Sequence, residues 1–220
     1  MSLKLLRGLF ILTIGLAPAC GDDGPGGSGA GGDIPGTGGA GQGGSGGQVT
    51  STGGAGGAGG GVDNRIDPIA TGHSWTYDVT QLGNFAYCPT GTVTAETLSE
   101  SELNGKHAFE ISNFCSGIAP SLFAVDGDLV MVDYQDTWVL ALDPPVEEGH
   151  TWSNGTSTFT WHAEGSVTVP AGTFDDCWRA TQNVTYTAYT IFCRGVGPVH
   201  WYSSDLNGDG FDAVLSAKNF

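Results

Sequence analysis

The residues whose type and spacing could bind a metal ion are three oxygen-bearing side chains near the C-terminal end of the sequence. Asp205, Asn207 and Asp209 stand at the first, third and fifth places of a D-x-N-x-D-G stretch, which is the spacing of the first half of a calcium-binding loop. No acid completes the loop, because Ala213 stands at its ninth place and Ser216 at its twelfth. A polar turn between two strands explains the same residues without metal. We therefore expect no cofactor, with Ca²⁺ at this loop as the alternative.

The sequence of residues 62–220 offers little support for catalysis. Its carboxylate pairs, Glu147–Glu148 and Asp175–Asp176, could suggest glycoside hydrolysis, but adjacent residues on a strand point to opposite faces. No GxSxG nucleophile motif lies in this region. The histidines show no HxH or HExxH spacing that would place two imidazoles on one metal ion, and they are His73, His107, His150, His162 and His200. We expect a protein that is not an enzyme, and a hydrolase of unknown type is the weakest hypothesis.

Aromatic residues are the other candidate for a site. All six tryptophans of the chain fall within residues 62–220. Exposed Trp or Tyr beside Asp and Asn could form a stacking platform for sugar rings, whereas aromatic side chains also fill the cores of small β domains, each burying roughly 150 to 250 Å². We expect core filling, and exposed aromatic patches would favour sugar binding instead.

The N-terminal segment has the layout of a secretory signal peptide. A short basic stretch, residues 1–7, precedes the apolar run 9–16, which is too short to cross a bilayer as a helix. The following Leu16-Ala17-Pro18-Ala19-Cys20 segment resembles the lipobox of bacterial lipoproteins, although Ala17 stands where that pattern has Leu. The resemblance implies that residues 1–19 are removed and that Cys20 is lipidated. Ordinary cleavage after the small residues, giving a freely secreted product, is the alternative.

Cysteine number favours lipidation. An exported chain meets an oxidising compartment in which thiols pair, and five cysteines leave one over. With Cys20 lipidated, four remain, and we predict the pairs Cys88–Cys115 and Cys177–Cys193. The second pair requires a hairpin whose turn lies near residue 186, because a turn at 182–183 would place Cys177 opposite residue 188 instead.

A glycine-rich segment separates the predicted anchor from the rest of the chain. Of the 38 glycines, 22 lie in residues 21–61, and a segment of this composition buries too little apolar surface to fold. We expect residues 20–61 to be a flexible tether with a typical reach of roughly 35 Å. The net charge of −16 argues against nucleic acid as a partner.

Residues 62–220 have the length of one domain, and their apolar residues alternate with period two. We predict an all-β domain, either an antiparallel sandwich or a partly open barrel. The clearest element is a hairpin in which Leu122–Val125 and Leu129–Val132 flank an Asp126-Gly127 turn. The tetrapeptides at 72–75 (GHSW) and 149–152 (GHTW) are similar, which we interpret as a favoured start of a strand.

Two short segments, residues 169–177 and 195–199, resemble a "PAG-F…C…GVG-V" pattern found in uncharacterised β domains of bacterial surface lipoproteins. The resemblance implies no activity. Our leading hypothesis is a non-enzymatic lipoprotein of the cell envelope whose domain binds or scaffolds an unidentified surface ligand or protein. Gly21 after the lipidated cysteine suggests the outer membrane as the site of anchoring. The alternative is a calcium-assisted carbohydrate-binding module.

Overall fold

The computed structural model describes residues 63–115 and 118–220, so the predicted signal peptide, Cys20 and the glycine-rich tether lie outside the described residues. None of the described residues is in a helix, and the described part therefore contains no helix that could cross a membrane. Twelve strands make up the domain, which confirms the all-β prediction. They are β1 (Ser74–Leu82), β2 (Gly91–Leu103), β3 (Lys106–Ile111), β4 (Ser121–Asp126), β5 (Leu129–Tyr134), β6 (Thr137–Leu142), β7 (Thr151–Ser153), β8 (Thr158–Val169), β9 (Gly172–Asn183), β10 (Thr187–Cys193), β11 (Gly197–Ser204) and β12 (Gly210–Lys218).

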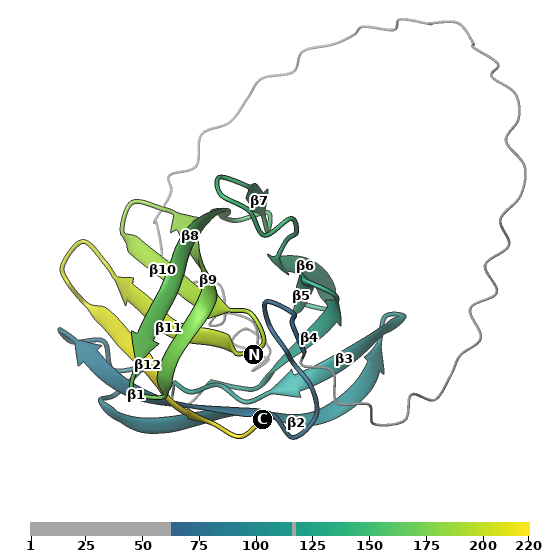
Figure 1. Cartoon of the computed structure of the whole chain (residues 1–220), viewed down its shortest axis with the longest axis horizontal. Coiled ribbons are helices and arrows are strands. Elements are labelled where there is room, and N and C mark those ends of the chain that lie inside the picture. Colours follow the sequence, from purple (N-terminus) through teal and green to yellow (C-terminus); the bar gives the residue numbers. More distant parts are fainter. Residues whose placement is uncertain (1–62, 116–117) are drawn as a thin grey trace, which may run out of the picture. The chain divides into compact units, whose positions relative to one another are not determined.

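The strands form one antiparallel sheet that curls into a nearly closed barrel (Figure 1). The order β6-β5-β4-β3-β2-β1-β12-β11-β10-β9-β8-β7 joins two runs of six consecutive strands through the pairing of β1 with β12. Of the two architectures that the sequence allowed, the partly open barrel is the one observed. The tetrapeptides 72–75 and 149–152 both lead into strands, as expected, and those strands are the first of each run of six.

Alternation along the strands places the apolar side chains inside the barrel. In β1, Trp75, Tyr77 and Val79 are buried, while the residues between them are more exposed. In β8, Phe159 and Trp161 follow the same rule. Because successive side chains on a strand point to opposite faces, this period-two pattern builds one continuous core around the inner face of the sheet.

The two ends of the sheet, β6 and β7, are joined by side chains rather than by a backbone ladder. The indole N–H of Trp152 in β7 donates to the carbonyl oxygen of Ala141 in β6 over 3.2 Å. In β8, Trp161 donates to the carbonyl oxygen of Asp143 over 3.0 Å. His150 Nε2 lies 2.9 Å from an Asp143 carboxylate oxygen. We call this junction the β6–β7 seam.

Both predicted disulfides are present. Cys88 and Cys115 are bonded with their Cα atoms 4.5 Å apart, and Cys177 and Cys193 with theirs 4.0 Å apart. The second pair lies in register on β9 and β10, whose connection covers residues 184–186. The turn therefore lies near residue 186 and not at residues 182–183.

The predicted hairpin at residues 122–132 exists, but its turn lies one residue later than expected. Asp126 pairs with Leu129, so Gly127 and Asp128 form the turn. Gly127 has a φ of 62°, a conformation that glycine adopts without strain. Asp128 has a further role, because its Oδ1 accepts a hydrogen bond from the backbone N–H of Ile66 over 2.9 Å and its carboxylate pairs with Arg194.

This contact anchors the segment that precedes β1. The N–H of Gly195 donates to the carbonyl oxygen of Arg65 over 2.9 Å, and Ile66, Pro68 and Ile69 are among the most deeply buried residues. Asp67 stands between them and is thereby held against the interior of the barrel.

Candidate functional site

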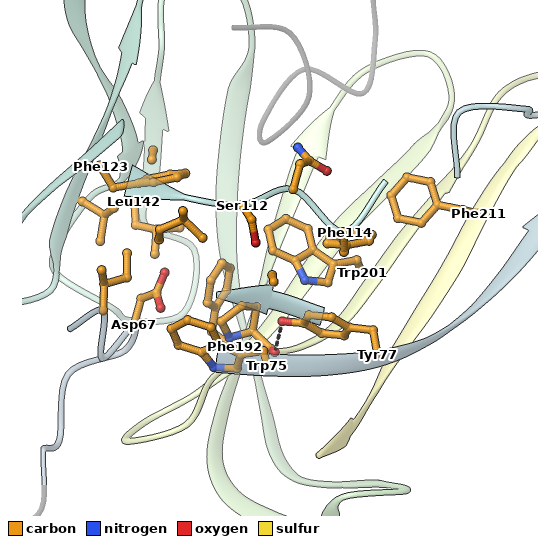
Figure 2. A pocket seen from close by; sticks show the side chains of 17 residues that line it. Asp67, Trp75, Tyr77, Ser112, Phe114, Phe123, Leu142, Phe192, Trp201 and Phe211 are labelled. Atoms are coloured by element: carbon orange, nitrogen blue, oxygen red, sulfur yellow. Dashed lines mark hydrogen bonds between the residues drawn. The ribbon is translucent and has the colours of Figure 1, made fainter. Parts of the chain in front are cut away.

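The interior of the barrel contains a cavity of about 70 Å³. Its wall is mainly apolar, with contributions from β1 to β6, from β10 to β12, and from the segments before β1 and after β3. Figure 2 shows the side chains gathered around this space. Seven aromatic residues line it: Trp75, Tyr77, Phe114, Phe123, Phe192, Trp201 and Phe211.

A carboxyl group, that of Asp67, also faces the cavity. Asp67 is half-buried as a residue, but its Oδ1 atom is enclosed and has no hydrogen-bond partner among the residues that the structure describes. Figure 2 shows the carboxyl group directed into the cluster of apolar and aromatic side chains. Burial raises the pKa of Asp67 to about 7, and the charge of nearby Arg65 only partly opposes this shift.

The backbone beside Asp67 requires glycine. A Cβ atom at Gly197 would lie 3.0 Å from Asp67 Oδ1 and 3.1 Å from Trp75 Nε1. Gly197 also has a φ of 86°, which side-chain-bearing residues rarely adopt. Because Gly197 has no side chain, the Asp67 carboxyl group and the Trp75 indole can lie close to the start of β11.

Two polar groups on β1 reach backbone acceptors. Trp75 Nε1 donates to the carbonyl oxygen of Val196 over 2.7 Å, and the Tyr77 hydroxyl donates to that of Pro198 over 2.9 Å. Burial raises the pKa of Tyr77, and the nearby Trp201 indole partly opposes the shift. The Trp201 Nε1 atom itself is enclosed and lacks a partner with hydrogen-bonding geometry within the described ranges. The cavity wall therefore offers an unpaired acceptor, on Asp67.

A second, smaller cavity of about 30 Å³ adjoins the first. The two share four wall residues, Ala141, Leu142, Phe192 and Trp201. Gln182 is a polar residue of the smaller wall, and its side-chain amide donates to Ser157 Oγ over 2.7 Å. Because Ala141 and Leu142 belong to β6, both cavities lie against the β6–β7 seam.

The residues of the predicted calcium loop form the turn between β11 and β12. Asp205 Oδ1 accepts hydrogen bonds from the backbone N–H groups of Asn207 and Asp209, over 2.7 and 2.9 Å. These bonds lower the pKa of Asp205. Asp209 Oδ1 accepts a hydrogen bond from the N–H of Asn84 over 2.8 Å. The Asp205 and Asp209 carboxylates thus stabilise the turn by accepting backbone hydrogen bonds. In the described part of the chain, no group of three or more His, Cys, Asp or Glu residues is placed to hold a metal ion.

The tryptophans contribute to the core rather than to a surface platform. Trp75, Trp152 and Trp161 are buried, and Trp138, Trp178 and Trp201 are half-buried. The large apolar side chains that are exposed in the described ranges are Tyr87, Leu98 and Leu206. The aromatic residues serve in the core and in the wall of the cavity, as expected from the sequence.

The histidines lie beside carboxylates outside the cavity. His150 contacts Asp143, His162 contacts Glu148, His200 contacts Asp212, and His107 contacts Glu100 and Glu102. The remaining one, His73, stacks on Phe220 with ring centroids 3.9 Å apart. The adjacent acids at 147–148 and 175–176 do not line the cavity either.

Asp67 was missed by reasoning from the sequence. The signal available was a single acid within the otherwise apolar stretch Ile66-Asp67-Pro68-Ile69. An isolated carboxylate in such a stretch is costly to bury, and this makes it a candidate for a binding role.

Comparison with known proteins gives distant structural resemblances. No family model and no curated protein matches the sequence. A predicted lipoprotein from Parabacteroides distasonis ATCC 8503 is similar with a TM-score of 0.47 and 14% identity, over 71% of this chain and 99% of that one. A predicted exported protein with a YmcC-like fold from Bacteroides fragilis NCTC 9343 has a TM-score of 0.44 and 11% identity, over 71% of this chain and 100% of that one.

Proposed function

We propose that this chain is an exported, lipid-anchored protein of the cell envelope that binds a small apolar ligand inside its barrel, without catalysing a reaction. The observation that carries the proposal is the aromatic-lined interior cavity into which the unpaired Oδ1 of Asp67 is directed. Binding sites for small molecules are concave and mostly apolar, with a few polar groups that fix the orientation of the ligand.

Energetics support a ligand in this cavity. Empty space in a core destabilises a protein because the wall atoms lose packing contacts. An enclosed polar atom without a partner adds the cost of its desolvation. A ligand with an apolar body and one polar group would relieve both costs, and these two features coincide at Asp67.

The anchor is proposed from the sequence of residues 1–61. The signal-peptide layout, the lipobox-like segment ending at Cys20 and the glycine-rich tether support a barrel held by lipid at a membrane surface, on a tether with a typical reach of roughly 35 Å. We propose that the lipid anchor lies in the outer membrane, because Gly21 rather than Asp follows Cys20, which in bacterial lipoproteins suggests this location. Replacing Cys20 with Ser should abolish metabolic labelling by a fatty-acid analogue and release the protein from membranes. A wild-type protein that is soluble, with an unmodified mature N-terminus, would support ordinary cleavage instead.

Ligand binding can be tested with benzyl alcohol as a probe of phenyl size. In saturation-transfer NMR with the full chain carrying Cys20→Ser, we expect transfer to the aromatic protons of the probe. Ala141→Leu adds a larger side chain where both cavities meet and should abolish the transfer. The matched control is Ala217→Leu on the exposed face of β12, which should leave it unchanged.

Two results would contradict the proposal. Equal transfer in the wild type and in Ala141→Leu would place the probe outside the cavity. Binding of a defined sugar on a glycan array, if it depended on calcium, would favour the carbohydrate-binding alternative.

A further inference from the structure

The enclosed Oδ1 atom of Asp67 makes no hydrogen bond or ion pair with the residues that the structure describes. Arg65, the nearest basic residue along the chain, is already engaged, because its Nη2 lies 2.6 Å from Asp63 Oδ2 and 3.0 Å from the carbonyl oxygen of Ile69. The hydroxyl of Tyr77 donates to Pro198. Neither of these neighbouring groups donates a hydrogen bond to Asp67 Oδ1, which therefore lacks a donor within the described ranges.

The aromatic wall is suited to a cation. Seven aromatic side chains line the cavity, and the face of an aromatic ring attracts ammonium groups, more strongly where water is excluded. The net charge of the chain, −16, also favours the approach of cations over anions. A carboxylate at one side of an aromatic enclosure is therefore complementary to an ammonium group attached to a compact apolar body.

We infer that the cavity selects small apolar amines, with the Asp67 carboxylate as the counter-ion of their ammonium group and the aromatic wall around their apolar body. This inference rests on the proposed function and names the class of its ligand. The apolar body that we infer is of about phenyl size, in keeping with the cavity volume of about 70 Å³. Asp67 acts as a specificity-determining residue, since a neutral isostere of the same ligand would leave the carboxylate unpaired.

A matched pair of probes separates this inference from the proposed function. Benzylamine and benzyl alcohol have similar size and shape but differ in charge, and calorimetric titration of the full chain carrying Cys20→Ser gives a Kd for each. We expect benzylamine to bind about ten- to a hundredfold more tightly at pH 8, as a charge-assisted hydrogen bond implies. The Asp67→Asn variant should bind benzylamine and benzyl alcohol with the same Kd. Binding of benzyl alcohol by this variant would show that its cavity is intact. Asp175→Asn, an exposed acid outside the cavity, should keep the preference.

The pH dependence gives a second readout that needs no substitution at Asp67. Because its pKa is about 7, lowering the pH from 8 to 5.5 protonates Asp67 and should weaken benzylamine binding about tenfold or more while leaving benzyl alcohol unaffected. Of the other titratable groups around it, Asp63 has a lowered pKa and Arg65 and Tyr77 have raised ones. His73 Nδ1 lies 2.8 Å from the carbonyl oxygen of Pro68. The variant His73→Gln is the control for this residue, and it should show the same pH dependence of benzylamine binding as the wild type.

The outcomes are distinct. Equal affinity of the wild type for the two probes, or a preference that survives Asp67→Asn, overturns the amine inference and leaves the cavity as a neutral apolar site. Absence of binding by either probe overturns the proposed function and the amine inference with it.

Discussion

The indole N–H of Trp152 donates to the carbonyl oxygen of Ala141 over 3.2 Å, and this bond joins the last strand of the sheet to the first. Elsewhere around the barrel, neighbouring strands are held by backbone ladders. The β6–β7 seam relies on side chains for the same purpose. Ala141 also lines both cavities, so the closure of the barrel and the wall of the proposed binding site share one residue.

Loss of this bond should loosen the seam. Trp152→Phe keeps an aromatic ring but removes the N–H, leaving the Ala141 carbonyl oxygen unpaired, and should lower the free energy of unfolding by about 1 to 3 kcal/mol. Amide hydrogen exchange should accelerate in β6 and β7 before it does in β1 and β12. The control is Trp178→Phe, since the Trp178 indole donates to the side chain of Asp176 at the surface. Uniform acceleration across all strands would show that the seam is not a separate weak point.

Stability should fall as the pH rises toward neutrality because of Asp67. Its pKa is raised from 3.8 to about 7 in the folded protein, so between these values the folded state binds a proton that the unfolded chain has released. The free energy of unfolding should therefore decrease between about pH 4 and pH 7, by roughly 2 to 4 kcal/mol from this group. Asp67→Asn should remove this component, as measured by urea denaturation at several pH values. A variant with the same pH profile as the wild type would contradict the assignment.

The last glycine of the D-x-N-x-D-G stretch is required by strand packing. A Cβ atom at Gly210 would overlap the carbonyl oxygen of Ser203 and lie 2.7 Å from its carbonyl carbon. Gly210→Ala should therefore destabilise the domain by more than about 3 kcal/mol or prevent folding. Gly208→Ala is the matched control, because its Cβ would meet no atom within 4 Å and only its φ of 83° opposes substitution, at a cost of about 1 kcal/mol. Similar thermal melting temperatures for the two variants would disprove the packing explanation.

Calcium should have little effect on the β11–β12 turn. The Asp205 and Asp209 carboxylates accept backbone N–H groups, and the described residues place no group of three or more His, Cys, Asp or Glu residues there to hold a metal ion. We expect the melting temperature of the full chain to stay the same, within about 1 °C, between chelator and millimolar Ca²⁺. A rise of several degrees that Asp205→Asn abolishes would instead establish a calcium site.

The two disulfides should differ in what their removal does to the cavity. Each closes a loop, of 27 and 16 residues, and chain entropy predicts a loss of about 3 kcal/mol on replacing either pair with Ser. Cys115 follows Phe114, which lines the cavity, whereas Cys177 and Cys193 are already paired in a β ladder. Removal of Cys88–Cys115 should thus weaken benzyl alcohol binding more than removal of Cys177–Cys193. Equal binding losses would indicate a general effect on stability.

The features that depend on residues close together in the chain could be predicted from the sequence. Period-two alternation, as in Trp75, Tyr77 and Val79, predicted strands because side chains on a strand point alternately to its two faces. The Cys177–Cys193 pair followed from the strand-like runs on either side of a short turn. The hairpin at 122–132 was correct apart from one residue, because Asp128 is held out of the ladder by Ile66 and Arg194, partners that are far away in the sequence.

The closure of the barrel and the position of the candidate site, in contrast, depend on contacts between residues that are far apart in the sequence. β1 pairs with β12 from the other end of the domain, and the Trp75 indole finds its acceptor 121 residues away, at Val196. No local pattern encodes such pairings, since they depend on how the whole sheet curls. The sequence marked Asp67 as an acid among apolar residues, but the enclosure of its Oδ1 by Trp75 and Gly197 arises only when β1 and β11 come together around the segment that carries it.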